Sequence, residues 1–407
     1  MKKAWIPLGL LLLCTCATFP FDLRAQAIED PGLFPVGWRD VSFDDVIFGQ
    51  GTIDGRVFYP ALVNGQNTQA DPQNGPYPLV AFQHGWLMGP GGYDNLCTHI
   101  ASWGFVIAST GTETGLFPNT NQFVRDTRAF LHWIEAEATD LESWLFAMTD
   151  GGAWSAVGHS MGGGTLSLLI GIESRIATIV GLQSVRVGSP GAQNMQAFPG
   201  NAFQIAGGSD WIVHSSTVHD WFENAISARR NIFYEIQGMG HTTCTDNPAF
   251  WDPLSGVEQA RIHQRLVTGL LRAEVGAKEN LYVDLLGEGI AMEPVKIECA
   301  CLEPPFWARI SAYQTGSIAA GMGGYPGFEA KMTHSLVPAS IPTVFGELAF
   351  DPGSLTTFFS GVFPAGGILQ ELIPIEPAWS GRSLFLQGIA LDVGGGTLTA
   401  TVEIAVP

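Results

Sequence analysis

The feature that most constrains the fold is a glycine-rich turn around one serine, Gly158-His159-Ser160-Met161-Gly162-Gly163-Gly164. A short apolar run, residues 154–157, precedes the turn, and residues 161–172 after it are small and apolar, as in a buried helix. Where a strand turns sharply into a helix, side chains would clash, and glycine avoids the clash. The pattern fits G-x-S-x-G, and its setting predicts a serine held at the carboxyl end of a buried strand.

Strand-like and helix-like segments alternate from about residue 40 to 275. Apolar residues recur at helical spacing over 123–138, and the last helix begins with a capping box, Ser255-x-x-Glu258. The apolar runs are short enough to be strands buried on both faces of a sheet: residues 79–83, 104–109, 154–158, 176–182, 202–206 and 232–236. The alternation predicts a doubly wound, mostly parallel α/β sheet.

The pattern of apolar and polar residues changes after residues 276–280. Helical periodicity disappears, and residues 397–406 alternate apolar and polar side chains, as in a strand with one solvated face. Residues 343–350 and 384–392 also resemble strands. We therefore expect a catalytic domain over residues 28–280 and a smaller, β-rich, sandwich-like domain over residues 281–407.

The N-terminal residues have the pattern of a signal peptide. Lys2 and Lys3 precede an apolar run, and Ala25-Gln26-Ala27 fits a cleavage site, so residues 1–27 are expected to be removed. No later stretch has the roughly 18 consecutive apolar residues of a membrane span. The expected location is secreted or periplasmic.

Export changes the interpretation of the cysteines. Four follow the signal peptide, Cys97, Cys244, Cys299 and Cys301, and an even number in an oxidising compartment favours disulfides. Their spacing leaves the pairing open. It also offers no second pair of ligands for a zinc site, so no metal is expected.

The composition limits the partners. With 19 basic and 38 acidic residues the formal net charge is −19. Nucleic acids bind through basic side chains that displace counterions, so a nucleic-acid partner is excluded.

A serine needs a base to take its proton and an acid to orient that base. His241 lies in a loop directly after a predicted strand, whereas His263 falls on the last helix. Asp210 follows the strand at 202–206, whereas Asp220 reads as helical and Asp246 comes after the histidine. The order Ser160, Asp210, His241 predicts a catalytic triad at one edge of the sheet.

The negative charge that forms during acyl transfer needs hydrogen-bond donors. The backbone N–H of Met161, at the start of the predicted helix, is one candidate. The second is the backbone N–H of Trp86, in the loop after the strand at 79–83, where His84 is expected to brace the loop. The indoles of Trp86 and Trp211 are expected to line the substrate cleft.

These motifs resemble the α/β-hydrolase superfamily, and within it dienelactone hydrolase-like proteins, chlorophyllases, platelet-activating-factor acetylhydrolases and cutinase-like polyesterases. The resemblance rests on His84-Gly85, residues 101–106, the turn around Ser160, Asp210 with Val213, and Gly240-His241. It implies a carboxylic-ester hydrolase that needs no cofactor. The loop Leu182-Gln183-Ser184-Val185 lacks the aromatic residue usual in the polyester-degrading members.

Several functions remain open within this expectation. The substrate is a small or a polymeric ester, and the β-rich domain is a candidate binding module for a polymer or a surface. An amidase or acyltransferase would use the same triad. A non-catalytic surface-binding protein could keep the fold without the activity.

Overall fold

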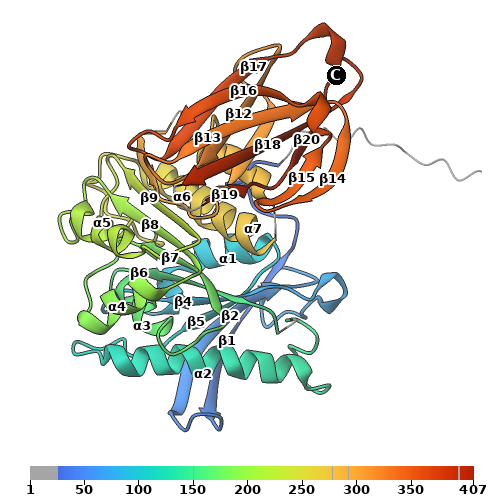
Figure 1. The fold of residues 1–407 in the computed structure, drawn as a ribbon. Helices are drawn as coiled ribbons and strands as arrows, with labels where there is room; N and C mark the ends of the chain where they lie inside the picture. The colour runs from blue at the N-terminus through green and yellow to red at the C-terminus, as the bar shows by residue number, and fades with distance from the viewer. Residues whose placement is uncertain (1–25, 150, 277, 292, 393–394) are drawn as a thin grey trace, which may run out of the picture.

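The computed structural model describes residues 26–407 except 150, 277, 292, 393 and 394. The expected signal peptide lies almost entirely outside the described residues. The first part of the chain forms an α/β sheet with helices, and the last part forms β-sheets that lie beside one edge of it (Figure 1). The predicted fold class is confirmed.

The large sheet has ten strands in the order β10-β9-β8-β7-β6-β4-β5-β2-β1-β3. From β5 to β9 neighbouring strands run parallel, while β2 and β10 pair antiparallel at the two sides. The strands are β1 (Val36–Asp45), β2 (Gly51–Pro60), β3 (Gly65–Gln66), β4 (Leu79–Gln83), β5 (Val106–Thr110), β6 (Trp154–His159), β7 (Ile176–Leu182), β8 (Asn201–Gly207), β9 (Arg230–Ile236) and β10 (Val295–Cys299).

Helices cover both faces of this sheet. They are α1 (Asp94–Ser102), α2 (Thr120–Thr139), α3 (Met161–Leu169), α4 (Ser189–Ala197), α5 (Ser215–Asn224), α6 (Gly256–His263), α7 (Gly269–Val275) and α8 (Tyr282–Leu285). A π-helical stretch, Gln264–Thr268, joins α6 to α7, and the predicted capping box at Ser255 is present. Short 3₁₀ turns occupy Pro72–Asn74, Pro90–Gly92, Glu279–Leu281, Pro352–Ser354 and Pro377–Trp379.

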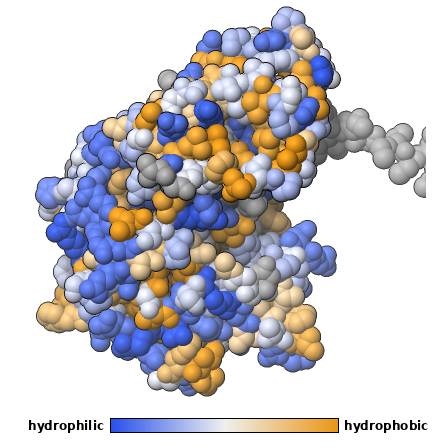
Figure 2. Space-filling view, in the orientation of Figure 1, coloured by the Kyte–Doolittle hydropathy of each residue, from blue (hydrophilic) through white to orange (hydrophobic). Residues whose placement is uncertain are grey.

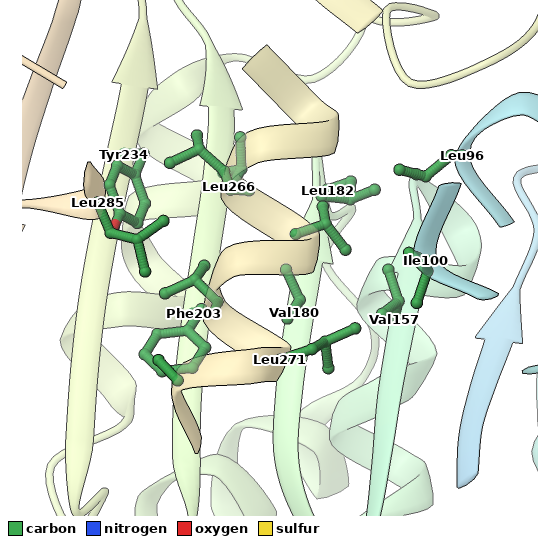
Figure 3. Packing of buried hydrophobic residues seen from close by; sticks show 14 of the residues in the cluster. Leu96, Ile100, Val157, Val180, Leu182, Phe203, Tyr234, Leu266, Leu271 and Leu285 are labelled. Atoms are coloured by element: carbon green, nitrogen blue, oxygen red, sulfur yellow. The ribbon is translucent and has the colours of Figure 1, made fainter. Parts of the chain in front are cut away.

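Alternate side chains along the strands pack into two separate cores, one on each face of the sheet. Val80 and Phe82 of β4 face the core under α1, α7 and α8, whereas Leu79 and Ala81 face the core under α2 and α3. In the first core, Leu266 of the π-helical stretch and Leu271 of α7 point onto the strands (Figure 3). In the same view Ile100 of α1 lies beside Val157 of β6. Burial on both faces explains why these strands read as continuous apolar runs.

The last part of the chain is a β-sandwich. One sheet has the order β11-β12-β17, a second has β16-β13-β18-β19 with β20 also on β18, and β14 and β15 form a hairpin. Both larger sheets contribute to one apolar core. The strands are β11 (Phe306–Ile310), β12 (Ser317–Gly323), β13 (Glu329–Ser335), β14 (Pro338–Thr343), β15 (Gly346–Phe350), β16 (Thr356–Val362), β17 (Ile368–Pro374), β18 (Ser383–Asp392), β19 (Gly395–Leu398) and β20 (Val402–Ala405).

Two strand predictions in this part need correction. The single strand expected over residues 397–406 is two strands, β19 and β20, which pair with different ends of β18. The interruption follows from Thr399, whose N–H and hydroxyl both bond to Gly388. Of the strand expected over residues 343–350, β15 covers Gly346–Phe350, while Thr343 ends β14 and the two residues between them form the turn.

The two parts share buried surface. β10 lies beyond residue 280 and still pairs with β9 of the large sheet. On β11, Phe306 and Ala308 face the sandwich core, while Trp307 between them is buried in the core under α8. Arg309 on the same strand pairs with Asp284 and Glu288. The sandwich is thus fastened to the α/β part by a tryptophan and by ion pairs.

We predict that Trp307→Ala lowers the free energy of unfolding by about 3–5 kcal/mol, because it leaves a cavity between the two parts. Denaturant unfolding of the full chain measures this. Tyr313→Ala, at a 64% exposed position of the same sandwich, is the matched control and should change stability by less than about 0.5 kcal/mol. Equal effects of the two substitutions would contradict a shared core at Trp307.

Candidate active site

Ser160 stands at the sharp turn between β6 and α3. Its backbone has φ 54° and ψ −113°, a conformation that costs energy for a residue with a side chain. The turn is fixed by two hydrogen bonds, from Ser160 N–H to Leu182 O (2.9 Å) and from Val185 N–H to Ser160 O (3.1 Å). A Cβ atom on Gly162 would collide with the carbonyl of Gln83 on β4, so the helix can approach the strand only with glycine there.

The structure brings the three predicted triad residues together. Ser160 Oγ lies 2.9 Å from His241 Nε2, and His241 Nδ1 lies 2.8 Å from Asp210 Oδ2. Each residue follows a strand of the parallel sheet: Ser160 follows β6, Asp210 follows β8 and His241 follows β9. Because parallel strands end at one edge, residues far apart in sequence meet there.

Asp210 is held in place by backbone amides. Its Oδ1 accepts the N–H groups of Ile212 (2.9 Å) and Val213 (2.8 Å), which leaves Oδ2 for His241. The carboxylate is buried. A carboxylate fixed in this way keeps the proton of His241 on Nδ1, so that Nε2 is free to accept the proton of the serine.

The two candidate oxyanion donors belong to the start of α3 and to the loop after β4. Met161 is the first residue of α3, where a helix leaves backbone N–H groups without intrahelical partners. Trp86 follows β4 in a loop braced by the buried His84, whose ring nitrogens lie 2.8 Å from the carbonyl oxygens of Gly85 and Thr112. Burial lowers the pKa of His84.

The two tryptophans expected to line the cleft are exposed on the loops that follow β4 and β8. Trp86 is 53% exposed, and its indole N–H donates to Leu116 O (3.1 Å). Trp211 is 67% exposed and follows Asp210 directly. The other candidates lie elsewhere: His263 is buried in α6, and Asp220 on α5 pairs with Arg186.

The four cysteines that the structure describes are buried free thiols: Cys97, Cys244, Cys299 and Cys301. The expected disulfides are therefore absent among the described cysteines. Burial raises the pKa of the thiols of Cys97 and Cys244. No group of three or more His, Cys, Asp or Glu side chains in the described part of the chain is arranged to hold a metal ion.

Two side chains at this site were not singled out from the sequence. His159, next to the serine, is buried, and its ring lies 5.0 Å from that of His241. Tyr93 lies 2.8 Å from His159 Nδ1 although 66 residues separate the two. His159 could have been noticed as part of the motif. No local pattern marks Tyr93.

Comparison with protein families gives a match to the chlorophyllase family over residues 67–194. The matched segment includes Trp86, Tyr93 and the turn around Ser160, and it ends before Asp210. The resemblance to the α/β-hydrolase superfamily, with its chlorophyllase-like group, is confirmed. The match indicates an α/β-hydrolase that hydrolyses esters. No curated protein matches the chain.

The buried histidines generate a prediction about stability and pH. Burial lowers the pKa of His159 to about 3, helped by the nearby His241, and lowers the pKa of His263 to about 4. In the unfolded chain a histidine titrates near pH 6.5. Between these values the unfolded state binds more protons, so stability present above pH 6.5 is lost as the pH falls.

The free energy of unfolding should therefore decrease from pH 7.5 to pH 5, by roughly 2 kcal/mol for each buried histidine. Urea unfolding at the two pH values measures the difference. His263→Leu should reduce the difference by about that amount, whereas His214→Leu, at an exposed position, should leave it unchanged. An unaltered difference in His263→Leu would contradict the buried, neutral state of His263.

Proposed function

We propose that the chain is a serine esterase that cleaves carboxylic esters through an acyl-enzyme on Ser160. The observation that carries the proposal is the continuous line of hydrogen bonds from Ser160 Oγ through His241 to Asp210. His241 takes the serine proton as Oγ attacks the ester carbon, and then gives it to the departing alcohol. Water, activated by the same imidazole, releases the acid and restores the serine.

The tetrahedral intermediate carries its negative charge on the former carbonyl oxygen. The backbone N–H groups of Met161 and Trp86 would donate hydrogen bonds to that oxygen. Met161 contributes from the first turn of α3, whose partial positive end also favours a negative charge. These roles follow from protein groups alone, so the proposal needs no cofactor.

The proposed substrate is an ester with large apolar groups, presented at a surface. Exposed apolar side chains lie on four loops that follow the parallel strands β4, β5, β8 and β9, at the edge of the sheet where the triad lies: Trp86 and Leu87, Leu116 and Phe117, Trp211 and Ile212, and Phe250 and Trp251. The first two loops are joined by the Trp86 indole bond to Leu116 O, and the last folds back onto the histidine loop through Ala249 N–H and Thr242 Oγ1 (3.0 Å). A clustered set of this size favours an apolar partner over water.

Export to the cell exterior or periplasm and a surface-binding role of the β-sandwich are parts of the same proposal. The signal-like residues support export. Val344, Val362 and Leu372 of the sandwich are exposed apolar side chains, and in the view of Figure 2 apolar patches lie on the upper, β-rich part of the molecule. Within the described chain, no helix has the length and apolar composition of a membrane span.

The triad is tested by Asp210→Asn, which should lower kcat for a soluble ester by about 10⁴-fold because the histidine takes the wrong tautomer. Asp220→Asn removes a carboxylate from the same stretch of chain and should leave kcat within about two-fold. A phosphonylating reagent should label Ser160 alone, as read by peptide mass mapping. A small loss in Asp210→Asn, or labelling that persists in Ser160→Ala, would contradict the assignment.

The apolar loops are tested by the double variant Trp211→Ala, Phe250→Ala. Hydrolysis of an emulsified long-chain ester should fall by about ten-fold or more, while hydrolysis of a short soluble ester should stay within about three-fold, because the lost side chains contact only the larger substrate. Val46→Ala with Leu141→Ala, also at exposed apolar positions, is the control and should change neither rate. An equal loss on both substrates would overturn the surface-presented ester.

A further inference from the structure

A second line of hydrogen bonds runs behind the triad. Gly85 N–H lies 2.8 Å from Tyr93 Oη, Tyr93 Oη lies 2.8 Å from His159 Nδ1, and His159 Nε2 lies 2.9 Å from the carbonyl oxygen of His241. Gly85 precedes Trp86, and His159 precedes Ser160. The line therefore joins the loop that offers an oxyanion donor to the residue that acts as the base.

The direction of each bond follows from the groups themselves. A carbonyl oxygen only accepts, so Nε2 of His159 carries the proton that faces His241. In the neutral ring Nδ1 is then a bare acceptor, and the hydroxyl of Tyr93 must donate to it. The phenol oxygen in turn accepts the N–H of Gly85. The opposite tautomer would place a bare Nε2 against the carbonyl oxygen of His241 at 2.9 Å, which is repulsive.

The neutral ring is favoured by its surroundings. His159 is 1% exposed, and burial, reinforced by the nearby His241, lowers its pKa to about 3. At pH values well above 3 the His159 ring is therefore neutral, and the line keeps one arrangement of protons. With a single proton on Tyr93 Oη, its 3.0 Å approach to Met88 Sδ is a packing contact.

The line is also rigid. Tyr93 is fully buried just before α1, and its ring packs 4.7 Å from that of Phe82 on β4. A Cβ atom on Gly85 would lie 2.9 Å from His159 Nδ1, so glycine is needed for the loop to come this close. Buried, fully paired polar groups of this kind hold one geometry.

We propose that Tyr93 and His159 are positioning residues that set the distance between the oxyanion loop at Trp86 and the base His241. The inference rests on the proposed ester hydrolysis and adds to it a requirement outside the triad. Neither side chain touches the substrate. Their effect is exerted on the transition state, because only there does the oxyanion need its donor and the imidazole its added proton.

The kinetic test is Tyr93→Phe, which removes one hydroxyl and keeps the ring. For a soluble ester kcat should fall by about ten- to a hundred-fold with KM within about three-fold. A misplaced oxyanion donor weakens the stabilisation of the transition state more than it weakens the binding of the substrate. His159→Phe should have a similar effect. The double variant should lose no more than the worse single variant, because the two act through one line.

The matched control is Tyr77→Phe. Tyr77 is buried and donates to Asp71 O (2.9 Å) away from the triad, so its loss of a buried hydroxyl should lower stability without changing kcat. Full kcat in Tyr93→Phe, additive losses in the double variant, or an equal loss of kcat in Tyr77→Phe would overturn the inference.

A second readout does not depend on activity. In the full-length protein, nitrogen chemical shifts of the His159 ring should show the neutral form protonated on Nε2 from pH 5 to 9, and Tyr93→Phe should change the Nδ1 shift. A ring protonated on Nδ1 would overturn the inference. Absence of esterase activity in the wild type would instead overturn the proposed function, and the nitrogen shifts would still decide the bonding.

Discussion

The strained backbone of Ser160 is the constraint on which the site depends. A residue with a side chain adopts φ 54° and ψ −113° only where its surroundings leave no alternative. Here β6 is buried in the sheet, α3 lies close against β4 at Gly162, and hydrogen bonds from Ser160 to Leu182 and from Val185 to Ser160 complete the turn. The packing of the sheet and its two cores offsets this backbone strain and holds the Ser160 hydroxyl within hydrogen-bonding distance of His241.

The sheet also explains how distant parts of the chain meet. Ser160, Asp210 and His241 each follow a parallel strand, and the spacing of those strands sets the spacing of the three side chains. Asp210 then uses backbone amides of its own turn to aim one oxygen at the imidazole. The loops that carry exposed apolar side chains follow the strands of this frame and lie outside its buried cores.

The sequence predicted the parts of the structure that have local signals. The strands at 79–83 and 176–182, the capping box at Ser255 and the order of Ser160, Asp210 and His241 all follow from periodicity and turn chemistry. The link from Tyr93 to His159 could not be predicted, because it joins residues 66 positions apart with no pattern between them. The even number of cysteines suggested disulfides, but an even number says nothing about the distances between the sulfur atoms. The four thiols are free. The alternation of apolar and polar residues over 397–406 did not reveal that the strand is interrupted at Thr399.

The place of β10 in the sheet has a consequence for how the protein is made. Every residue assigned to chemistry lies at or before His241, yet the sheet receives its edge strand from Val295–Cys299, and the core under α8 receives Trp307 later still. During synthesis the catalytic residues therefore emerge well before the sheet can receive its edge strand β10. Until the C-terminal part of the chain has been made, that edge of the sheet and that core stay exposed to solvent.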